Sequence, residues 1–254
     1  MNAKKMIFAC ACVLFALAGR AQTQVIAHRG FWQTEGSAQN SIASLQKAAE
    51  AKVYGSEFDV QLTADGVIVV NHDDVIDGMT IAETPYRKLK DVQLENGEAL
   101  PTLSDYLSVG KKLPEIQLIL EIKPHKTKEQ EDEIARKTVE MVKKAGMEKQ
   151  VEYISFSMNV CEQLVRLTPG SEVAYLGSDV TPEEIKAKGM TGIDYHYKAF
   201  RKHPEWVKEA HGLGMKVNVW TVDDAKDMKR MLDLSVDYIT TDRPLEAAEM
   251  AKKQ

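Results

Sequence analysis

Acidic side chains with the spacing of a metal site occur near the ends of two apolar runs of this sequence. Glu57 and Asp59 are two residues apart, so a β-strand would project both to one side. Glu121 closes another such run. Carboxylates brought together raise one another's pKa unless a cation holds them ionised. Because oxygen ligands suit Ca²⁺ or Mg²⁺, we expect Glu57, Asp59 and Glu121 to bind one divalent cation.

Two basic residues also follow apolar runs, Arg29 after the first run and Lys123 after the run that Glu121 closes. Both would add positive charge beside the carboxylates. Three carboxylates, a divalent cation, Arg29 and Lys123 sum to a charge of +1, which a phosphodiester monoanion would neutralise. Arginine can direct two donors at two phosphate oxygens, whereas lysine acts as a point charge. We therefore expect both side chains to contact a phosphate group.

Two histidines lie where they could flank the cation. His28 ends the first apolar run and His72 ends a short run after the second. Imidazoles that titrate near neutral pH can act as general acid and base, each contributing about 10²–10⁴-fold. Trp220 could pack an alcohol or glycerol moiety against its ring, or it could plug the end of a barrel. We interpret the remaining histidines as structural: His125, His196, His203 and His211.

A scaffold must bring these separate run ends together, and the hydrophobic pattern predicts one. Eight β-rich runs are expected as strands, at 25–27, 56–62, 118–122, 151–156, 172–176, 192–197, 216–221 and 238–241. Eight segments of helical period alternate with them, at 42–51, 103–109, 128–144, 158–167, 182–188, 204–213, 223–232 and 244–251. This alternation favours an α/β fold, a closed (β/α)8 TIM barrel rather than an open doubly wound sheet. In such a barrel, reactive side chains lie at the carboxyl ends of the strands.

One apolar run, 67–71, breaks this alternation. Only residues 63–66 separate it from the preceding strand, which is too few for a crossover helix. We therefore expect an extra antiparallel strand in a hairpin, with residues near Glu57 and Asp59 opposite residues near His72.

The chain is expected to contain a leader, residues 1–21, and one barrel domain, residues 22–254. Two lysines, a short apolar run and a small-residue ending are typical of an export signal, and the run is too short to span a bilayer. We therefore expect a periplasmic or secreted protein. Anchoring as a lipoprotein through Cys10 or Cys12 is the less favoured alternative, because neither residue follows a convincing lipobox. An insertion at about 73–101 has weak periodicity and is interpreted as a lid or small subdomain over the barrel mouth.

Net charge and cysteine content argue against nucleic-acid binding and against an internal disulfide. Removing the leader removes three basic residues, which takes the net charge from −5 to −8. Such an acidic domain is a poor ligand for nucleic acid. Only Cys161 would remain, so no internal disulfide can form. We expect no stable membrane insertion after the leader is removed, and the pattern does not predict an oligomeric state.

The order of these motifs resembles the glycerophosphodiester phosphodiesterase family. The matching segments extend over nearly the whole expected domain and are 28–30, 57–60, 63–66, 69–73, 120–123, 217–222 and 241–244. The resemblance implies a phospholipase-C-like barrel that releases an alcohol and glycerol 3-phosphate from deacylated phospholipids. It also implies roles that agree with the charge argument, with metal ligands Glu57, Asp59 and Glu121, acid and base His28 and His72, and phosphate contacts Arg29 and Lys123.

One segment departs from the family's pattern. Where the family commonly has Pro-Glu-Asn-Thr, this chain has Ala, Gln, Asn and Ser at positions 38–41. Neutral Gln39 in place of glutamate either alters metal preference and substrate fit or serves merely as a helix-entry residue. Asn40 remains available to hydrogen-bond within the site, and we expect it to contact substrate.

Two other functions stay open. A related barrel phosphodiesterase could act on phospholipid head groups, but several acidic residues in 73–101 argue against an apolar, membrane-facing rim. A non-catalytic periplasmic protein could bind a phosphodiester on the same scaffold, but the presence of His28 and His72 argues against this interpretation.

Overall fold

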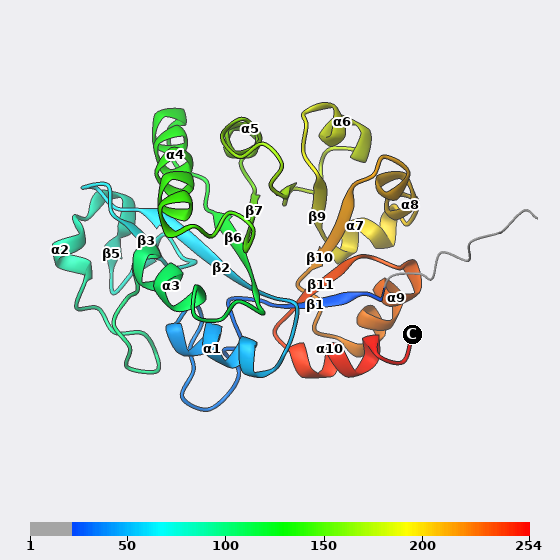
Figure 1. The fold of residues 1–254 in the computed structure, drawn as a ribbon, viewed down its shortest axis with the longest axis horizontal. Helices are drawn as coiled ribbons and strands as arrows, with labels where there is room; N and C mark the ends of the chain where they lie inside the picture. The colour runs from blue at the N-terminus through cyan, green and yellow to red at the C-terminus, as the bar shows by residue number, and fades with distance from the viewer. Residues whose placement is uncertain (1–21) are drawn as a thin grey trace, which may run out of the picture.

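Eight parallel strands close into a barrel in the computed structural model, which describes residues 22–254 (Figure 1). The barrel strands are β1 (Gln24–Ala27), β2 (Gly55–Leu62), β6 (Gln117–Ile122), β7 (Val151–Ser155), β8 (Val173–Tyr175), β9 (Gly192–His196), β10 (Lys216–Trp220) and β11 (Tyr238–Thr241). The ring closes where β1 pairs in parallel with β11, with Ala27 opposite Thr241. The predicted (β/α)8 barrel is confirmed, whereas the predicted leader lies outside the described residues.

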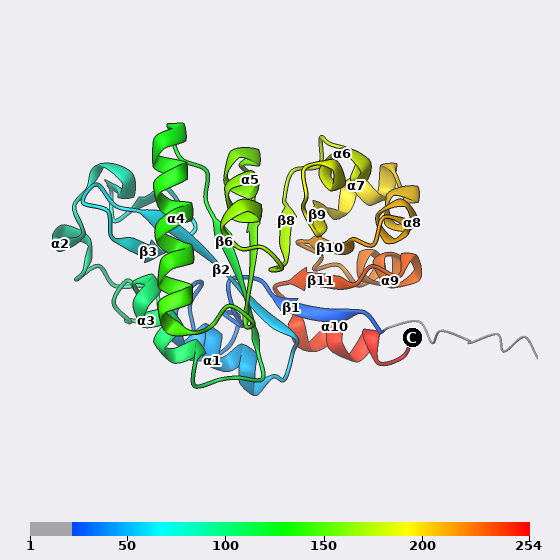
Figure 2. The same ribbon diagram turned by 45° about the horizontal axis from the view of Figure 1, so that its top comes forward.

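Helices follow the strands and cover the outside of the barrel, as Figures 1 and 2 show. They are α1 (Ile42–Glu50), α3 (Leu103–Gly110), α4 (Lys128–Ala145), α5 (Met158–Leu167), α6 (Pro182–Ala187), α7 (Tyr197–Lys202), α8 (Glu205–Gly212), α9 (Ala225–Leu234) and α10 (Pro244–Ala251). Capping residues in the sequence determine where several of these helices begin and end. The Thr127 hydroxyl accepts a hydrogen bond from the Gln130 amide at the start of α4, and Gly146 ends that helix in the left-handed conformation. None of the helices within residues 22–254 is both long enough and apolar enough to cross a membrane.

The helix α7 is a difference from the sequence expectation. The expected strand at 192–197 extends one residue too far, since β9 ends at His196 and α7 begins at Tyr197. The His196 side chain caps this helix by accepting a hydrogen bond from the Lys198 amide. Because α7 follows β9 directly and has only six residues, its start was assigned to the end of the strand.

Side chains alternate along each strand between the helices and the interior of the barrel. Outward residues such as Phe58 and Leu120 join the main core between sheet and helices. Inward residues form a separate apolar cluster inside the barrel, made of Ile26, Ile119, Ile154 and Leu176. The interior is thus filled by side chains, and ligands are confined to the ends of the strands.

The predicted hairpin is confirmed. Strand β3 (Ile68–Val70) pairs antiparallel with β2, and Val70 lies opposite Val60. The Asn71 amide donates to the Asp59 carbonyl at 3.0 Å, so the next residue, His72, lies beside the acidic end of β2. On that side of β2, β1 pairs with Gly55 and Ser56 and β3 pairs with residues 60–62, so Glu57 and Asp59 lie in the interval between the two neighbouring strands.

The insertion after the hairpin forms short elements with an apolar cluster of their own. They are β4 (Val75–Ile76), β5 (Met79–Thr80), the 3-10 helix η1 (Ile81–Glu83) and α2 (Tyr86–Leu89). The cluster consists of Val69, Ile81, Leu89 and Leu100. Figures 1 and 2 place these elements beside β3, at the left of the barrel. Glu98 then ties the segment to the barrel, since both its carboxylate oxygens accept hydrogen bonds from the amides of Ile42 and Ala43 at the start of α1.

Candidate active site

The three predicted metal ligands meet at the carboxyl ends of neighbouring strands. Glu57 and Asp59 lie on β2, and Asp59 stands opposite Glu121 of β6 in the parallel register. One oxygen from each of the three carboxylates can be chosen so that all lie within 4.8 Å of one another. All three side chains are buried. Buried carboxylates this close are unfavourable without a compensating cation.

The electrostatics of the cluster show this cost. Burial raises the pKa of Glu57 well above its usual range, and the charges of Asp59 and Glu121 raise it further. Burial and Asp59 likewise raise the pKa of Glu121 to about 7, against the opposing effect of Lys123. Oε1 of Glu57 is buried without a hydrogen-bond partner within residues 22–254. A hard divalent cation prefers such an all-oxygen set, so these residues can hold one.

Lys123 and Arg29 surround the same carboxylates with positive charge. Nζ of Lys123 lies 2.8 Å from Oε1 of Glu121 and 3.5 Å from Oδ1 of Asp59. Burial acts to lower the pKa of Lys123, but Glu121 and Asp59 outweigh it, so the pKa is raised and the amine is charged. Nε of Arg29 lies 3.8 Å from Oδ2 of Asp59. Burial acts to raise the pKa of Asp59, but Lys123 and other polar neighbours lower it overall.

A tight turn after β1 directs Arg29 toward the cluster. Arg29 and Gly30 have φ angles of 54° and 76°, in the left-handed region. This turn lets the Arg29 amide donate to Oε2 of Glu57 at 2.7 Å. A Cβ atom at Gly30 would lie 2.2 Å from the Ser44 hydroxyl oxygen of α1, so only glycine fits there. The His-Arg-Gly motif therefore reflects backbone geometry as well as side-chain chemistry.

Asn40 holds Asp59 in place, a role that was not expected from the sequence. Its Nδ2 donates to Oδ2 of Asp59 at 2.8 Å, and its Oδ1 accepts from the Asp59 amide at 3.0 Å. The side chain is only 2% exposed. Because both ends of its amide contact Asp59, Asn40 positions this carboxylate.

The structure shows which side chain Gln39 contacts. Its Oε1 accepts a hydrogen bond from Nη1 of Arg29. Helix α1 begins later, at Ile42, where the Ser41 hydroxyl is the cap. Gln39 is therefore a neutral hydrogen-bond partner of Arg29, the expected phosphate contact.

His28 is held by an acidic residue from the last strand. Its Nδ1 lies 2.8 Å from Oδ1 of Asp242, and the Trp32 indole N–H donates to the same oxygen at 2.9 Å. Burial acts to raise the pKa of Asp242, but the bond to His28 and other neighbours outweigh it and lower the pKa overall. An ionised Asp242 accepts a hydrogen bond from the N–H at Nδ1 of His28, which leaves Nε2 of His28 free to exchange a proton with a ligand.

His72 lies at the edge of the site and is partly exposed. Its Nδ1 is 2.7 Å from Oδ1 of Asp73. Burial lowers the pKa of His72 and Lys123 contributes in the same direction, against the effect of Asp59. The ring is therefore neutral at pH 7 and able to accept a proton.

These groups line one cavity, which we call the mouth cavity. It has a volume of about 130 Å³, and its walls include His28, Arg29, Glu57, His72, Glu121, Asp194 and Trp220. The apolar side is built from Ile154, Phe156 and Leu176. The Phe156 and Trp220 rings pack edge to face with centroids 5.4 Å apart. The structure thus brings the two predicted histidines and two of the three predicted metal ligands to one cavity, with Asp59 against its wall.

Comparison with known proteins decides the family. The sequence pattern of the Glycerophosphoryl diester phosphodiesterase family matches residues 28–246. The chain belongs to this family. A glycerophosphodiester phosphodiesterase from Caldanaerobacter subterraneus is 30% identical over 250 residues, covering 91% of this chain and 99% of that protein.

Solved structures of this family support the assignment. A glycerophosphodiester phosphodiesterase from Parabacteroides distasonis has 54% identity and a TM-score of 0.91, covering 92% of this chain and 99% of that one. An Oleispira antarctica phosphodiesterase, solved in complex with the product sn-glycerol-3-phosphate, has 26% identity and a TM-score of 0.78, covering 92% and 98%. As a member of this family, the protein is a phosphoric diester hydrolase.

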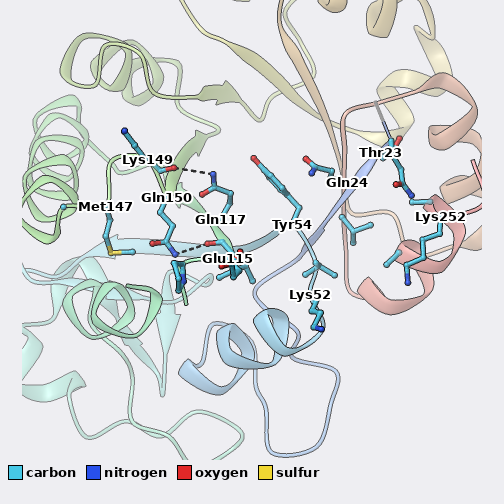
Figure 3. Close-up of a pocket in the computed structure, with 18 residues that line it drawn as sticks. Thr23, Gln24, Lys52, Tyr54, Glu115, Gln117, Met147, Lys149, Gln150 and Lys252 are labelled. Carbon is cyan, nitrogen blue, oxygen red and sulfur yellow. Dashed lines mark hydrogen bonds between the residues drawn. The ribbon is translucent and has the colours of Figure 1, made fainter. Parts of the chain in front are cut away.

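A larger pocket lies at the other end of the barrel and does not carry the family's motifs (Figure 3). Its volume is about 750 Å³, and it lies where β1, β2 and β6 begin. Polar side chains such as Gln24, Gln117 and Gln150 line it, along with Tyr54. In TIM barrels, chemistry occurs at the carboxyl ends of the strands, so the smaller mouth cavity is the candidate active site.

Two parts of this site were not predicted from the sequence. Asp242 was given no role, because only the closure of the barrel places the end of β11 beside the end of β1. Asp194 lies inside a run whose alternation looked ordinary, and only its burial in the cavity wall singles it out.

Proposed function

We propose that this protein hydrolyses glycerophosphodiesters to an alcohol and glycerol 3-phosphate, with one bound Ca²⁺ or Mg²⁺ and with His28 and His72 as the acid–base pair. The observation that supports this most directly is the cluster of Glu57, Asp59 and Glu121, with oxygens within 4.8 Å, beside a cavity that both histidines line. The product named in the Oleispira antarctica complex is the one this reaction would release.

Charge matching supports a phosphodiester as the substrate. With a divalent cation held by the three carboxylates, Lys123 and Arg29 leave the site with a charge of +1. A phosphodiester carries one negative charge and would neutralise it. Glu57, Asp59 and Glu121 would hold the cation, and when bound it would stabilise negative charge on the phosphate oxygens.

The two histidines have environments suited to different steps. His72 is neutral at pH 7, so it would take the proton from the attacking oxygen, which is a glycerol hydroxyl or a water. That oxygen forms a bond to phosphorus while the bond from phosphorus to the alcohol oxygen breaks. When the glycerol hydroxyl attacks, this step gives a cyclic glycerol phosphate, and a water must then attack phosphorus and break one P–O bond of the ring to give glycerol 3-phosphate. His28 would donate a proton from Nε2 to the leaving alcohol, and the carboxylate of Asp242 would stabilise the imidazolium form before transfer.

Arg29 and Lys123 would orient the phosphate during this step. The Arg29 side chain is fixed by its bond to Gln39, and Lys123 by its contacts with Glu121 and Asp59. Positioned cations of this kind lower the barrier by holding the reacting groups in line and by stabilising charge. Trp220 would pack against the glycerol or alcohol moiety at the apolar wall.

We also propose that the protein is exported. The charge order, length and small-residue ending of residues 1–21 are typical of an export signal. Expression of the full chain followed by cell fractionation and N-terminal sequencing tests this proposal. Recovery of the uncleaved chain from the cytoplasm of its native host would contradict it.

An assay of the purified 22–254 chain tests the proposed activity. Glycerophosphocholine, glycerophosphoethanolamine and glycerophosphoinositol should be hydrolysed, and a chelator should abolish turnover until Ca²⁺ or Mg²⁺ is added back. Equal rates with and without chelator would remove the cation from the mechanism. Hydrolysis of intact phospholipids, with none of the three glycerophosphodiesters accepted, would replace the proposed substrate class.

A further inference from the structure

A buried carboxyl group in the wall of the mouth cavity has no role in the mechanism above. Asp194 lies on β9, and its register partner Asn218 lies on β10. Its side chain is only 1% exposed, yet it lines the mouth cavity together with Glu57 and Trp220. A fully buried acidic residue is rare unless a partner or a ligand compensates its polar atoms.

Only half of this carboxyl group is satisfied. Oδ2 of Asp194 accepts a hydrogen bond from Nδ2 of Asn218 at 3.0 Å. Oδ1 is buried and lacks a hydrogen-bond partner in the part of the chain that the structure describes. Leaving such an atom without a partner is unfavourable. An unsatisfied polar atom that lines a cavity is therefore a candidate contact for a ligand.

The neighbours of Asp194 fix its orientation. Nδ2 of Asn218 also donates to the Thr240 hydroxyl at 2.9 Å, and Oδ1 of Asn218 accepts from the Val219 amide at 2.8 Å. Because the Asn218 side chain is fully engaged, it cannot turn to satisfy Oδ1 of Asp194. Thr240 lines the same cavity, so this network forms part of the cavity wall.

Asp194 also belongs to the wall that would receive the polyol part of a substrate. The Trp220 indole N–H donates to the Asp194 backbone carbonyl at 2.9 Å, which links the aromatic ring to this residue. A ligand packed against Trp220 would thus lie close to the Asp194 carboxyl group. The expected phosphate contacts, Arg29 and Lys123, follow β1 and β6. The wall formed by Asp194 of β9 and Trp220 of β10 does not include them.

The chemistry of Asp194 suits a hydroxyl group better than a phosphate. Burial raises the pKa of Asp194 to about 8, and Glu121 contributes in the same direction. At pH 7 the group is therefore largely a neutral acid, which can both donate and accept a hydrogen bond. A hydroxyl group is the partner that can do both in return, whereas a phosphate oxygen without a proton can only accept.

We propose that Asp194 is a specificity-determining residue that binds a hydroxyl group of the substrate's glycerol moiety through Oδ1. This inference rests on the proposed function and names a residue that selects its substrate. A smaller space of about 30 Å³, lined by Asp194, Glu152 and Tyr238, lies further into the barrel. It has room for a buried water and not for a substrate, so a purely structural use of Oδ1 is the alternative to test.

Comparing two substrates separates these alternatives. Glycerophosphocholine has two glycerol hydroxyls, whereas bis(4-nitrophenyl) phosphate is a phosphodiester without any hydroxyl. Asp194→Ala should lower kcat/KM for glycerophosphocholine by about 10-fold or more, because a site built to bind a hydroxyl discriminates strongly through it. The same variant should change kcat/KM for bis(4-nitrophenyl) phosphate by less than about 2-fold. Asp194→Asn keeps the size of the side chain and serves if the alanine variant fails to fold, with a smaller loss in the same direction.

Product inhibition gives a readout that does not depend on turnover of the glycerol substrate. With bis(4-nitrophenyl) phosphate as the reporter, glycerol 3-phosphate should inhibit Asp194→Ala more weakly than the unchanged protein. Inorganic phosphate should inhibit both equally, because it has no glycerol hydroxyl. The matched control is Glu152→Gln, which also changes a carboxyl group inside the barrel but does not line the mouth cavity; it should preserve the ratio of the two activities.

Equal losses on both substrates, or no loss on either, would overturn the role of Asp194. Unchanged inhibition by glycerol 3-phosphate would overturn it as well. The proposed function itself would be contradicted by a different outcome, in which the unchanged protein hydrolyses bis(4-nitrophenyl) phosphate but none of the glycerophosphodiesters.

Discussion

Oδ1 of Asp242 lies 2.8 Å from Nδ1 of His28 and accepts a second hydrogen bond from the Trp32 indole at 2.9 Å. The pair joins the residue that follows the first barrel strand to the residue that follows the last. A carboxylate in this position fixes both the orientation of the imidazole and the nitrogen that carries its proton.

Replacing Asp242 should therefore impair catalysis more than binding. We expect Asp242→Asn to lower kcat by about 10²-fold or more with little change in KM, because His28 would lose its orientation and its charge partner. The measurement is kcat across pH, since a change in the shape of the pH profile is not expected from a merely structural defect. Trp32→Phe is the control that removes only the second hydrogen bond, and it should lose much less activity. An Asp242→Asn enzyme with unchanged kcat would exclude this role.

The histidine pair makes a second prediction. His28→Ala and His72→Ala should each lower kcat by at least ~10²-fold while leaving the melting temperature nearly unchanged, since neither ring is part of the apolar core. Steady-state kinetics and thermal unfolding measure the two effects separately. His203→Ala, at an exposed position, is the control and should keep full activity. Full kcat in either cavity variant would refute the assigned acid–base roles.

The acidic cluster predicts an unusual dependence of stability on pH. The pKa of Glu121 is raised from 4.5 in the unfolded chain to about 7 in the folded protein, and the pKa of Glu57 is also raised. Between pH 4.5 and about 7, the folded protein therefore binds more protons at these two residues than the unfolded chain does. The free energy of unfolding should then fall as pH rises, by up to about 1.4 kcal/mol per pH unit for each titrating group. We expect the melting temperature in chelator to decrease from pH 5 to pH 8.

A divalent cation should weaken or reverse this dependence, because it favours the ionised carboxylates that it binds. Thermal unfolding with chelator and with added Ca²⁺ or Mg²⁺ makes the comparison. Glu121→Gln is the matched variant, since it lacks one of the titrating groups and should show a shallower slope in chelator. Identical slopes under both conditions would contradict a cation site at these residues.

The turn after β1 predicts different costs for two glycine substitutions. Gly30 and Gly36 have φ angles of 76° and 75°, so alanine is strained by a similar amount at each. At Gly30 the added Cβ would also lie 2.2 Å from Oγ of Ser44, whereas at Gly36 no atom of residues 22–254 would lie within 4 Å. We expect Gly36→Ala to cost about 1 kcal/mol and Gly30→Ala about 2–4 kcal/mol. Urea unfolding measures both, and equal losses would show that the contact with Ser44 is easily relieved.

Gln39 allows a test of the charge on Arg29. Gln39→Glu would convert a neutral hydrogen bond into an ion pair and lower the net charge of the cation-bound site from +1 to 0. We expect KM for glycerophosphodiesters to rise several-fold at low ionic strength, with a smaller effect at high salt. Gln39→Met is the uncharged control for loss of the hydrogen bond. An unchanged KM in the glutamate variant would indicate that the charge of Arg29 does not contribute to substrate binding.

The scaffold and the acidic cluster could be predicted because both depend on local pattern. The alternation of β-rich and helical segments indicates a barrel, and the rule that parallel strands direct their carboxyl ends to one face places Glu57, Asp59 and Glu121 together. The hairpin followed from the short spacing between its two strands. These inferences need no knowledge of which side chains touch.

The remaining features depend on contacts between distant residues or on elements too short to show a period. The His28–Asp242 pair spans 214 positions and exists only because the barrel closes. The role of Asn40 follows from the left-handed turn at that residue, with φ of 60°, which directs its amide to Asp59. Strands β4 and β5 have two residues each and leave no pattern to detect.

Ring closure between β1 and β11 also has a consequence for when the chain becomes active during synthesis. The proposed metal ligands and both proposed proton carriers lie within the first half of the sequence, but the partner that orients His28 is made last. A chain released before residue 242 would contain nearly the full set of reactive groups and still lack the restraint on its acid. The full rate of phosphodiester cleavage would thus be reached only when the final strand has docked, so activity would report on completion of the barrel.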